Sequence, residues 1–321
     1  MATLSSLMDY YYSTMYPELK TLEEERLRII GRLKKVAFIL LSVAAISVFV
    51  LIHSAHFVPL HAFGLSGILG VVLFMFMFQH EKSGYQSLFK DNVIEKIIYF
   101  INPTFVYRKD GAIYENEYLH SGLFPQSYDR YRGSDLVEGV HEGVSLRFSD
   151  LHVEQKRRTK NNKEEWHTLF QGLFFIADFH KSFRARTYVL PDVAERALGV
   201  LGTWLQELNR THGELIKLDH VAFEKHFAVY GEDRVEAHYI LSHAFMERIL
   251  DFAKKRDKNL CLGFVDGKMY LALSYTKALF EPSITRSLLA FEHIKEYFEL
   301  LEMVFGIIDE FKLNQKLWSK R

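Results

Sequence analysis

The sequence predicts an α+β cytoplasmic domain with mainly antiparallel strands and a long C-terminal helix, preceded by a two-helix transmembrane hairpin. Two uncharged apolar runs, residues 36–52 and 62–78, are separated by only nine residues. The chain beyond them alternates between strand patterns and helical spacings. The expected parts are therefore a cytoplasmic N-terminal helical segment at 1–35, a membrane hairpin at 36–78 and a cytoplasmic domain at 79–321.

Each apolar run is 17 residues long, which is near the lower limit for a helix that crosses a bilayer at about 1.5 Å per residue. The loop between the runs contains no Lys or Arg, whereas basic residues flank both runs on their other side: Arg26, Arg28, Arg32, Lys34, Lys35, Lys82, Lys90 and Lys96. The positive-inside rule then predicts that both termini are cytoplasmic. Two helices of a soluble core are the alternative, although such helices usually carry a polar face.

Glycine recurs at every third residue in the second run, at Gly64, Gly67 and Gly70. Small residues on one face allow close helix approach in a membrane. We therefore expect this face to contact the first span or a neighbouring chain; the alternative is that lipid simply tolerates these glycines.

Composition excludes several functions. Lys plus Arg and Asp plus Glu number 40 each, so no global basic field favours nucleic acid. The chain has a single cysteine, Cys261, so it cannot form an internal disulfide, and we expect this residue to be a small side chain of the core. Nucleophile turns, phosphate loops, zinc-protease signatures and paired cysteines are missing. We therefore predict no catalytic residue, no cofactor and no metal.

Helix signals come first along the chain: residues 18–35 lead into the first span, and 91–101 end at Asn102-Pro103. Strand patterns follow at 144–153, with a bulge at Asp150, and then at 166–178 and 184–190. Pro191 opens a predicted helix that Gly213 ends.

The last third continues with a strand near 227–230, a helix from Ser242 to about 255 and a hairpin over 260–274 that turns at Asp266-Gly267. A long helix spans roughly 283–311. Its apolar seam has coiled-coil spacing and either joins two protomers in a homo-oligomer or packs on the helix's own sheet. The seam comprises Phe291, Ile294, Phe298, Leu301, Phe305 and Ile308.

Two similar segments, each with Asp and Glu three residues apart, lie at 131–139 and 230–237. They suggest two subdomains divided near residue 213. Asp135 with Glu138, and Asp233 with Glu236, could also act as acid–base pairs, although solvated turn residues explain them equally well. Of the histidines, His53, His56 and His61 in the loop, or His238 with His243, could be metal ligands, but their spacing lacks a complete ligand set.

Several motifs occur in one order along the chain: FQGLFFIADFHK at 170–181, FEKHFAVY at 223–230, LFEPS at 279–283 and LNQKLW at 313–318. Together they resemble a bacterial family known as domain of unknown function 3137, over roughly residues 90–318. The resemblance implies a cytoplasmic domain anchored in the bacterial inner membrane by several passes. It carries no catalytic residues over to this chain.

The most basic stretch is predicted to be the tip of a long hairpin, and its candidate contact residues are Lys156, Arg157, Arg158, Lys160 and Lys163. Near a membrane such a tip could bind anionic lipid or a partner; the alternative is a solvated loop. The leading hypothesis is a membrane-anchored interaction or scaffold module that binds membrane lipids, an unidentified membrane or cytoplasmic protein, or its own copies, and no nucleic acid. A membrane-associated enzyme and a channel or transporter subunit are the alternatives.

Overall fold

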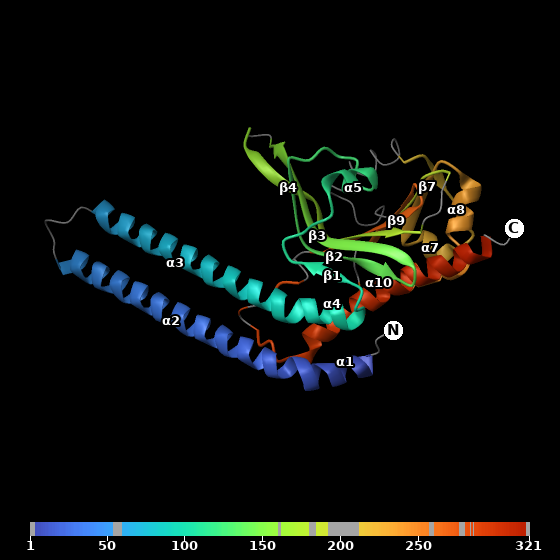
Figure 1. Cartoon of the computed structure of the whole chain (residues 1–321). Helices are drawn as coiled ribbons and strands as arrows, with labels where there is room; N and C mark the ends of the chain where they lie inside the picture. The colour runs from blue at the N-terminus through green and yellow to red at the C-terminus, as the bar shows by residue number, and fades with distance from the viewer. Residues whose placement is uncertain are drawn as a thin grey trace. The chain divides into compact units, whose positions relative to one another are not determined.

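A computed structural model of the chain describes residues 4–53, 60–159, 162–179, 184–191, 212–256, 260–275, 280–282, 284 and 286–318, without the side chains of 50–66, 293 and 313–318. It contains two compact units (Figure 1). The helical unit comprises residues 2–97 and 281–295, and the sheet unit comprises 98–280 and 296–321. The α+β class, the antiparallel strands and the C-terminal helix are confirmed.

The helical unit is built on two long antiparallel helices. Helix α1 (Leu4–Tyr10) continues through a π turn, Tyr11–Met15, into α2 (Tyr16–His53). Helix α3 (Leu60–Phe89) continues through a second π turn, Lys90–Ile94, into α4 (Glu95–Ile101). The predicted entry of the 18–35 helix into the first apolar run, and the predicted helix at 91–101, are thus confirmed.

The two π turns follow from the spacing of the buried side chains. Every fourth residue is buried on both helices: Leu7, Tyr11, Met15 and Leu19 on one, and Tyr85, Phe89, Val93 and Ile97 on the other. An α-helix repeats every 3.6 residues, so a strict four-residue spacing would drift around its axis. A π turn takes in an extra residue and keeps the buried stripe on one side.

Large apolar side chains of α2 and α3 are exposed, among them Phe38 (71% exposed) and Phe76 (76%). Among the residues described, no helix combines the length and the apolar character that a membrane crossing requires. Side chains of 50–66, which include parts of both predicted spans, His53, His56, His61 and Gly64, lie outside that description. The transmembrane hairpin and its loop histidines therefore stay predictions.

The sheet unit contains one nine-stranded antiparallel sheet in the order β1-β2-β3-β4-β9-β8-β5-β7-β6. Its strands are β1 (Val106–Arg108), β2 (Arg130–His141), β3 (Val144–Arg158), β4 (Glu164–Asp178), β5 (Thr187–Pro191), β6 (Glu214–Ile216), β7 (Phe227–Gly231), β8 (Leu260–Val265) and β9 (Lys268–Ser274). The helices are α5 (Glu115–His120), α7 (Val221–Glu224), α8 (Arg234–Ile240), α9 (His243–Arg256) and α10 (Phe291–Trp318). Strands from both sides of residue 213 share this sheet.

Turn and cap residues were the most reliable local signals. Asp266 and Gly267 both have positive φ, +47° and +78°, as a two-residue hairpin turn requires, and they join β8 to β9. Ser242 Oγ accepts a hydrogen bond from the Phe245 N–H at 3.3 Å before α9. The predicted helix after Pro191 falls mostly on 192–211, outside the described residues; Pro191 itself ends β5.

The bulge predicted at Asp150 is on the wrong strand. β3 pairs with β4 without interruption from Ser145 to Val153, and the extra residue lies in β2, between Ser134 and Val137. Asp135 there has a φ of +63°. The apolar pattern of β3 slips because Ser149 is buried, and its Oγ accepts a hydrogen bond from the Ile113 N–H at 3.1 Å.

The C-terminal helix begins at Phe291, later than the predicted residue 283. Ile294, Phe298, Leu301, Phe305 and Ile308 are all buried within the chain. The Phe298 ring centroid lies 6.5 Å from that of Phe100, and the Phe305 centroid 5.8 Å from that of Phe105. The prediction of an oligomer contact through this seam is therefore corrected: these side chains pack on their own chain and are not accessible to a second protomer.

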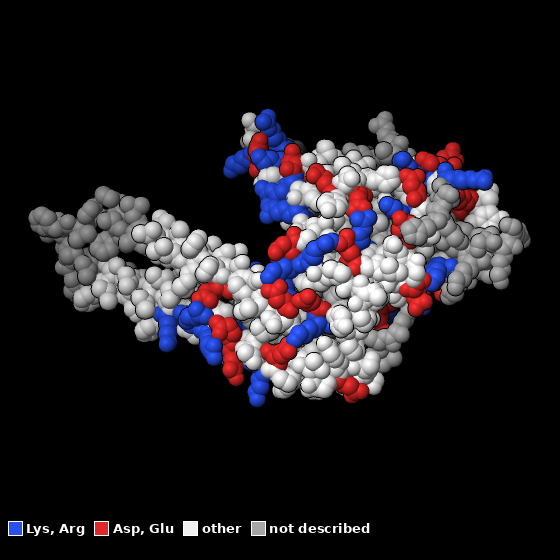
Figure 2. Space-filling view, in the orientation of Figure 1, with Lys and Arg blue, Asp and Glu red and all other residues white. Residues whose placement is uncertain are grey.

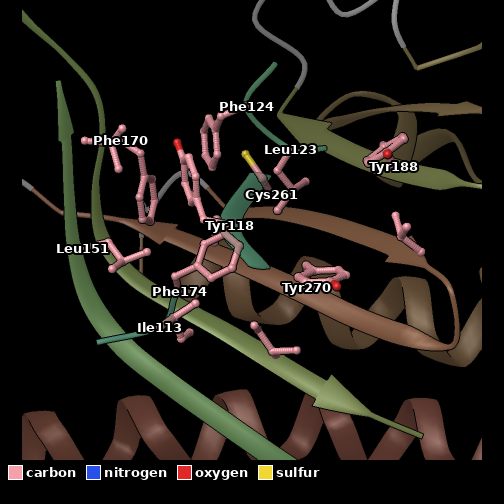
Figure 3. Close-up of a cluster of buried hydrophobic side chains, with 14 of the residues drawn as sticks. Ile113, Tyr118, Leu123, Phe124, Leu151, Phe170, Phe174, Tyr188, Cys261 and Tyr270 are labelled. Carbon is pink, nitrogen blue, oxygen red and sulfur yellow. The ribbon is translucent and has the colours of Figure 1, made fainter. Parts of the chain in front are cut away.

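Aromatic residues dominate the core on one side of the sheet (Figure 3). Tyr118 stacks on Phe124 with ring centroids 5.7 Å apart, and the Phe124 ring lies 4.9 Å from that of Phe170. Cys261 is buried in the same cluster. Burial raises the pKa of its thiol to about 12, which agrees with the predicted core role.

Candidate functional site: the basic arm of the β3–β4 hairpin

The far half of the β3–β4 hairpin extends beyond its neighbours as a two-stranded arm (Figure 1). Pairing of β2 with β3 ends at Arg130 and Glu154, and pairing of β4 with β9 ends at Gly172 and Ser274. We use the term basic arm for residues 155–167 together with Arg130 and Arg132, which lie at its base.

One face of the basic arm collects cations around a tryptophan. Register places Lys156 opposite Trp166 and Arg158 opposite Glu164, so their side chains share a face. The Arg130 guanidinium carbon lies 3.6 Å from the Trp166 ring centroid, and Lys156 Nζ lies 5.1 Å from it. Both distances fall within cation–π range, and the ring therefore holds both cations in place.

Carboxylates neutralise part of this charge. Glu154 accepts a hydrogen bond from Arg130 Nη1 at 3.0 Å and lies 3.6 Å from Arg132 Nη2. Glu164 lies 3.1 Å from Lys156 Nζ and 3.9 Å from Arg158 Nη2. Six described basic residues against four acidic ones leave a net charge of +2: Arg130, Arg132, Lys156, Arg157, Arg158 and Lys163 against Asp129, Glu154, Glu164 and Glu165. Figure 2 shows both signs at this arm, with Lys and Arg prominent toward its end.

The predicted basic run is divided between the two faces of the arm. Arg157 is opposite Glu165, and its Nε donates a hydrogen bond to Gln155 Oε1 at 2.9 Å, whereas Lys156 and Arg158 share the tryptophan face. Lys163 closes the turn, since its carbonyl accepts a hydrogen bond from the Thr159 N–H at 2.8 Å. Lys160 lies outside the described residues.

Sequence reasoning missed Arg130, Arg132 and Trp166. The signal for the arginines was their alternation in Arg-Tyr-Arg at 130–132, which places both on one face of a strand. Their approach to Trp166 depends on the register across three strands, which no local pattern reveals.

The two acidic pairs have structural partners. Asp135 is buried and accepts hydrogen bonds from Tyr107 Oη at 2.5 Å and Ser134 Oγ at 2.6 Å. Asp233 caps α8 by accepting from the N–H groups of Val235 and Glu236, at 2.8 and 3.1 Å. One segment is a strand bulge and the other a helix cap, so the sequence similarity between them does not reflect a repeated structure.

His238 and His243 do not form a site, but His243 lies beside His220 and Glu247. His220 Nδ1 accepts a hydrogen bond from the Phe223 N–H at 3.2 Å, and Nε2 lies 2.8 Å from Glu247 Oε1. Because Nδ1 accepts, Nε2 carries the proton and donates it to Glu247. A histidine that binds a metal donates from its second nitrogen instead. His220 is therefore a helix cap with both nitrogens engaged.

Of the three glycines in the second apolar run, Gly70 faces the partner helix. A Cβ on Gly70 would lie 3.1 Å from Leu40 Cδ2 of α2, whereas a Cβ on Gly67 would meet nothing within 4 Å. Gly64 lies outside the described side chains. The predicted close approach to the first helix therefore applies to Gly70 and not to Gly67.

The second part of the chain matches a known protein family. Residues 168–313 match the DUF3137 family, described as a protein of unknown function. The predicted resemblance to this family is thereby confirmed over residues 168–313, whereas the part predicted over 90–167 lies outside the match. The match runs from β4 into α10 and begins just after the basic arm.

One solved structure is also similar, the crystal structure of the mycobacterial trehalose monomycolate transport factor A. It is 9% identical, with a TM-score of 0.33, over 65% of this chain and 92% of that chain. No curated protein matches the sequence.

Proposed function

We propose that this chain is an interaction module anchored in the bacterial inner membrane by the α2–α3 hairpin, with both termini in the cytoplasm. The main support is the exposure of apolar side chains around α2. Phe38, Ile39, Leu41, Val43 and Ile46 are each more than half exposed. Consecutive exposed apolar residues leave this helix without a polar face, which suits lipid far better than water.

The position of the charges supports a membrane boundary at one end of the hairpin. Arg32 Nη1 lies 2.8 Å from Glu81 Oε1, so these residues are level with each other on α2 and α3. Arg32 precedes the first apolar run by four residues and Glu81 follows the second by three. Both helices therefore become apolar at the same level, as a bilayer would require, and the basic residues there favour the cytoplasmic side.

In this proposal the sheet unit provides the contact surface and the basic arm is its principal binding element. Partners include membrane lipids, a membrane or cytoplasmic protein, and further copies of the chain. The acidic pairs that would have favoured an enzyme bind backbone and neighbouring side chains instead, among the residues described.

Cysteine labelling in intact bacterial cells tests the anchor. Native Cys261 is buried, so the unmodified chain serves as the unlabelled control. We expect Ser54→Cys, in the predicted external loop, to react with a membrane-impermeant maleimide. Ser13→Cys on the exposed side of the first π turn should react only after permeabilisation. The proposal would be contradicted if Ser54→Cys failed to react even in permeabilised cells in which Ser13→Cys reacts, and if alkaline carbonate extracted the chain from the membrane.

A further inference from the structure

We propose that the basic arm binds an anionic phospholipid surface, with Trp166 at the contact. The inference rests on the proposed anchor, because a tether confines the arm near the leaflet and makes a weak contact effective. It specifies the ligand class of the arm, which is the phosphate of a lipid headgroup.

The exposed fractions of the ion-pair partners favour this contact. The side chains of Arg132 and Arg158 are 59% and 73% exposed, whereas that of Glu154 is 10% exposed. At the base of the arm Arg132 is therefore outermost, with the Glu154 carboxylate beneath it, and Arg158 is exposed near the turn. Glu164 is itself half exposed and is the group that a headgroup phosphate would replace as the partner of Lys156 and Arg158.

Trp166 favours a membrane over other anionic partners. It lies near the base of the arm, opposite Lys156, and its residue exposure of 40% leaves part of the ring accessible. Tryptophan prefers the bilayer interface, where an apolar ring and a polar edge are both accommodated. Guanidinium groups held beside it match phosphate oxygens in geometry.

Nucleic acid fits this surface less well. Single strands bind where successive aromatic rings stack on successive bases, and Trp166 is the one aromatic residue among 155–167. The described part of the arm, counted together with the adjoining Asp129 and Glu154, has a net charge of only +2, which is small for a surface that binds a polyanion, and the whole chain has a formal net charge of zero.

Fluorescence quenching in proteoliposomes tests the contact with the full-length chain. Trp204→Phe and Trp318→Phe leave Trp166 as the single tryptophan reporter. Vesicles contain brominated phosphatidylcholine, with or without phosphatidylglycerol. We expect quenching of Trp166 only in vesicles with phosphatidylglycerol, and its decline as salt is raised, because exposed charges are screened.

Charge reversal provides the decisive comparison. Lys156→Glu with Arg158→Glu should lower the ratio of docked to undocked arms about 30-fold, on the basis of about fivefold for each basic residue near an anionic surface. The matched control, Lys225→Glu with Arg234→Glu, changes the charge equally on exposed residues away from the arm and should leave quenching unchanged.

Equal quenching in neutral and anionic vesicles, an absence of quenching, or equal loss in both double variants would overturn the proposal. Release of the arm by RNA or by an acidic polypeptide at matched charge concentration would likewise assign it to another ligand. Failure of the anchor is recognised separately, because the chain would then not float with neutral vesicles.

Discussion

Arg26 and Glu23 form a two-pronged ion pair inside the helical unit. Arg26 Nε donates to Glu23 Oε2 at 2.9 Å, and Nη2 donates to Oε1 at 2.6 Å. The same two side chains bind a distant segment, because Arg26 Nη1 donates to the Ile284 carbonyl at 2.7 Å and Glu23 Oε2 accepts from the Leu288 N–H at 3.0 Å. One ion pair therefore attaches Ile284 and Leu288 to α2.

Loss of Arg26 should destabilise this attachment strongly. Arg26→Ala leaves the Glu23 carboxylate buried without its cation, and we expect a loss of about 3 kcal/mol in the free energy of unfolding. Chemical denaturation and amide exchange at residues 286–290 measure it. Arg28→Ala is the matched control, since Arg28 pairs with Glu25 at the same spacing but is 69% exposed, and it should cost under about 0.5 kcal/mol. Equal effects would refute a special role for the buried pair.

Acid should release the same segment. Burial alone would raise the pKa of Glu23, but hydrogen bonds from Arg26 and from the Leu288 N–H hold the net pKa below its ordinary value. The ionised carboxylate therefore stabilises the fold above about pH 4.3, the usual glutamate pKa, and this contribution disappears as pH falls through the lower folded-state value. Amide exchange at 286–290 between pH 7 and 3 should accelerate at the acid end. Glu23→Gln should lose that acid step; its persistence would point to another group.

Gly172 should not tolerate a side chain. Its φ is +150°, and a Cβ there would collide with the Leu273 carbonyl of β9. Gly172→Ala must separate β4 from β9, and we expect a loss of about 4 kcal/mol or failure to fold. Gly143→Ala is the control, because a Cβ at Gly143 meets nothing within 4 Å and costs only about 1–2 kcal/mol of backbone strain. Thermal unfolding of the two variants compares them directly, and similar melting temperatures would argue against the collision.

Cys261 should be inert in the folded protein. Its thiol is buried, and its pKa of about 12 leaves almost no thiolate at neutral pH. We expect no reaction with an aromatic disulfide reagent until denaturant unfolds the sheet, and one thiol per chain afterwards. Rapid reaction of the native protein would show that the cluster around Tyr118 opens readily.

Zinc should leave the stability of the chain unchanged, although His220, His243 and Glu247 lie together. His220 uses Nδ1 for its helix cap and Nε2 for Glu247, so binding would require the cap to break. Differential scanning calorimetry with and without Zn²⁺ should give the same melting temperature. A rise that His243→Ala abolished would show that the cluster rearranges into a metal site.

Short-range signals in the sequence predicted much of the fold. The Asp266-Gly267 turn, the Ser242 cap and the 91–101 helix each depend on a few neighbouring residues, and all three are present. The start of α10 was misplaced because Ile284 and Leu288, both within the predicted helix, bind side chains of α2 more than 250 positions away. The same reason explains why Glu23 and Arg26 look like solvated surface charges in sequence.

The candidate site was predicted only in part, for a comparable reason. Charge density along the chain located Lys156 to Arg158. Trp166 comes close to Arg130 only because β2, β3 and β4 pair in one particular register. That register is shifted by the bulge in β2 and again between β3 and β4 at Val153 and Glu154. The alternation of apolar residues does not reveal the bulge in β2, in which the buried Asp135 accepts hydrogen bonds from Tyr107 and Ser134.

The paired π turns have a consequence for how relatives of this chain can vary in length. Each turn contains one residue more than an α-helix needs, at Tyr11–Met15 and at Lys90–Ile94. The π turn accommodates that residue within the helix, so deleting it would restore an α-helical turn and leave the helix beyond it nearly unrotated. A deletion elsewhere in these helices would instead rotate everything on its far side by about 100°. Single-residue gaps in an alignment should therefore concentrate at the two π turns, and each turn should lose its residue independently of the other.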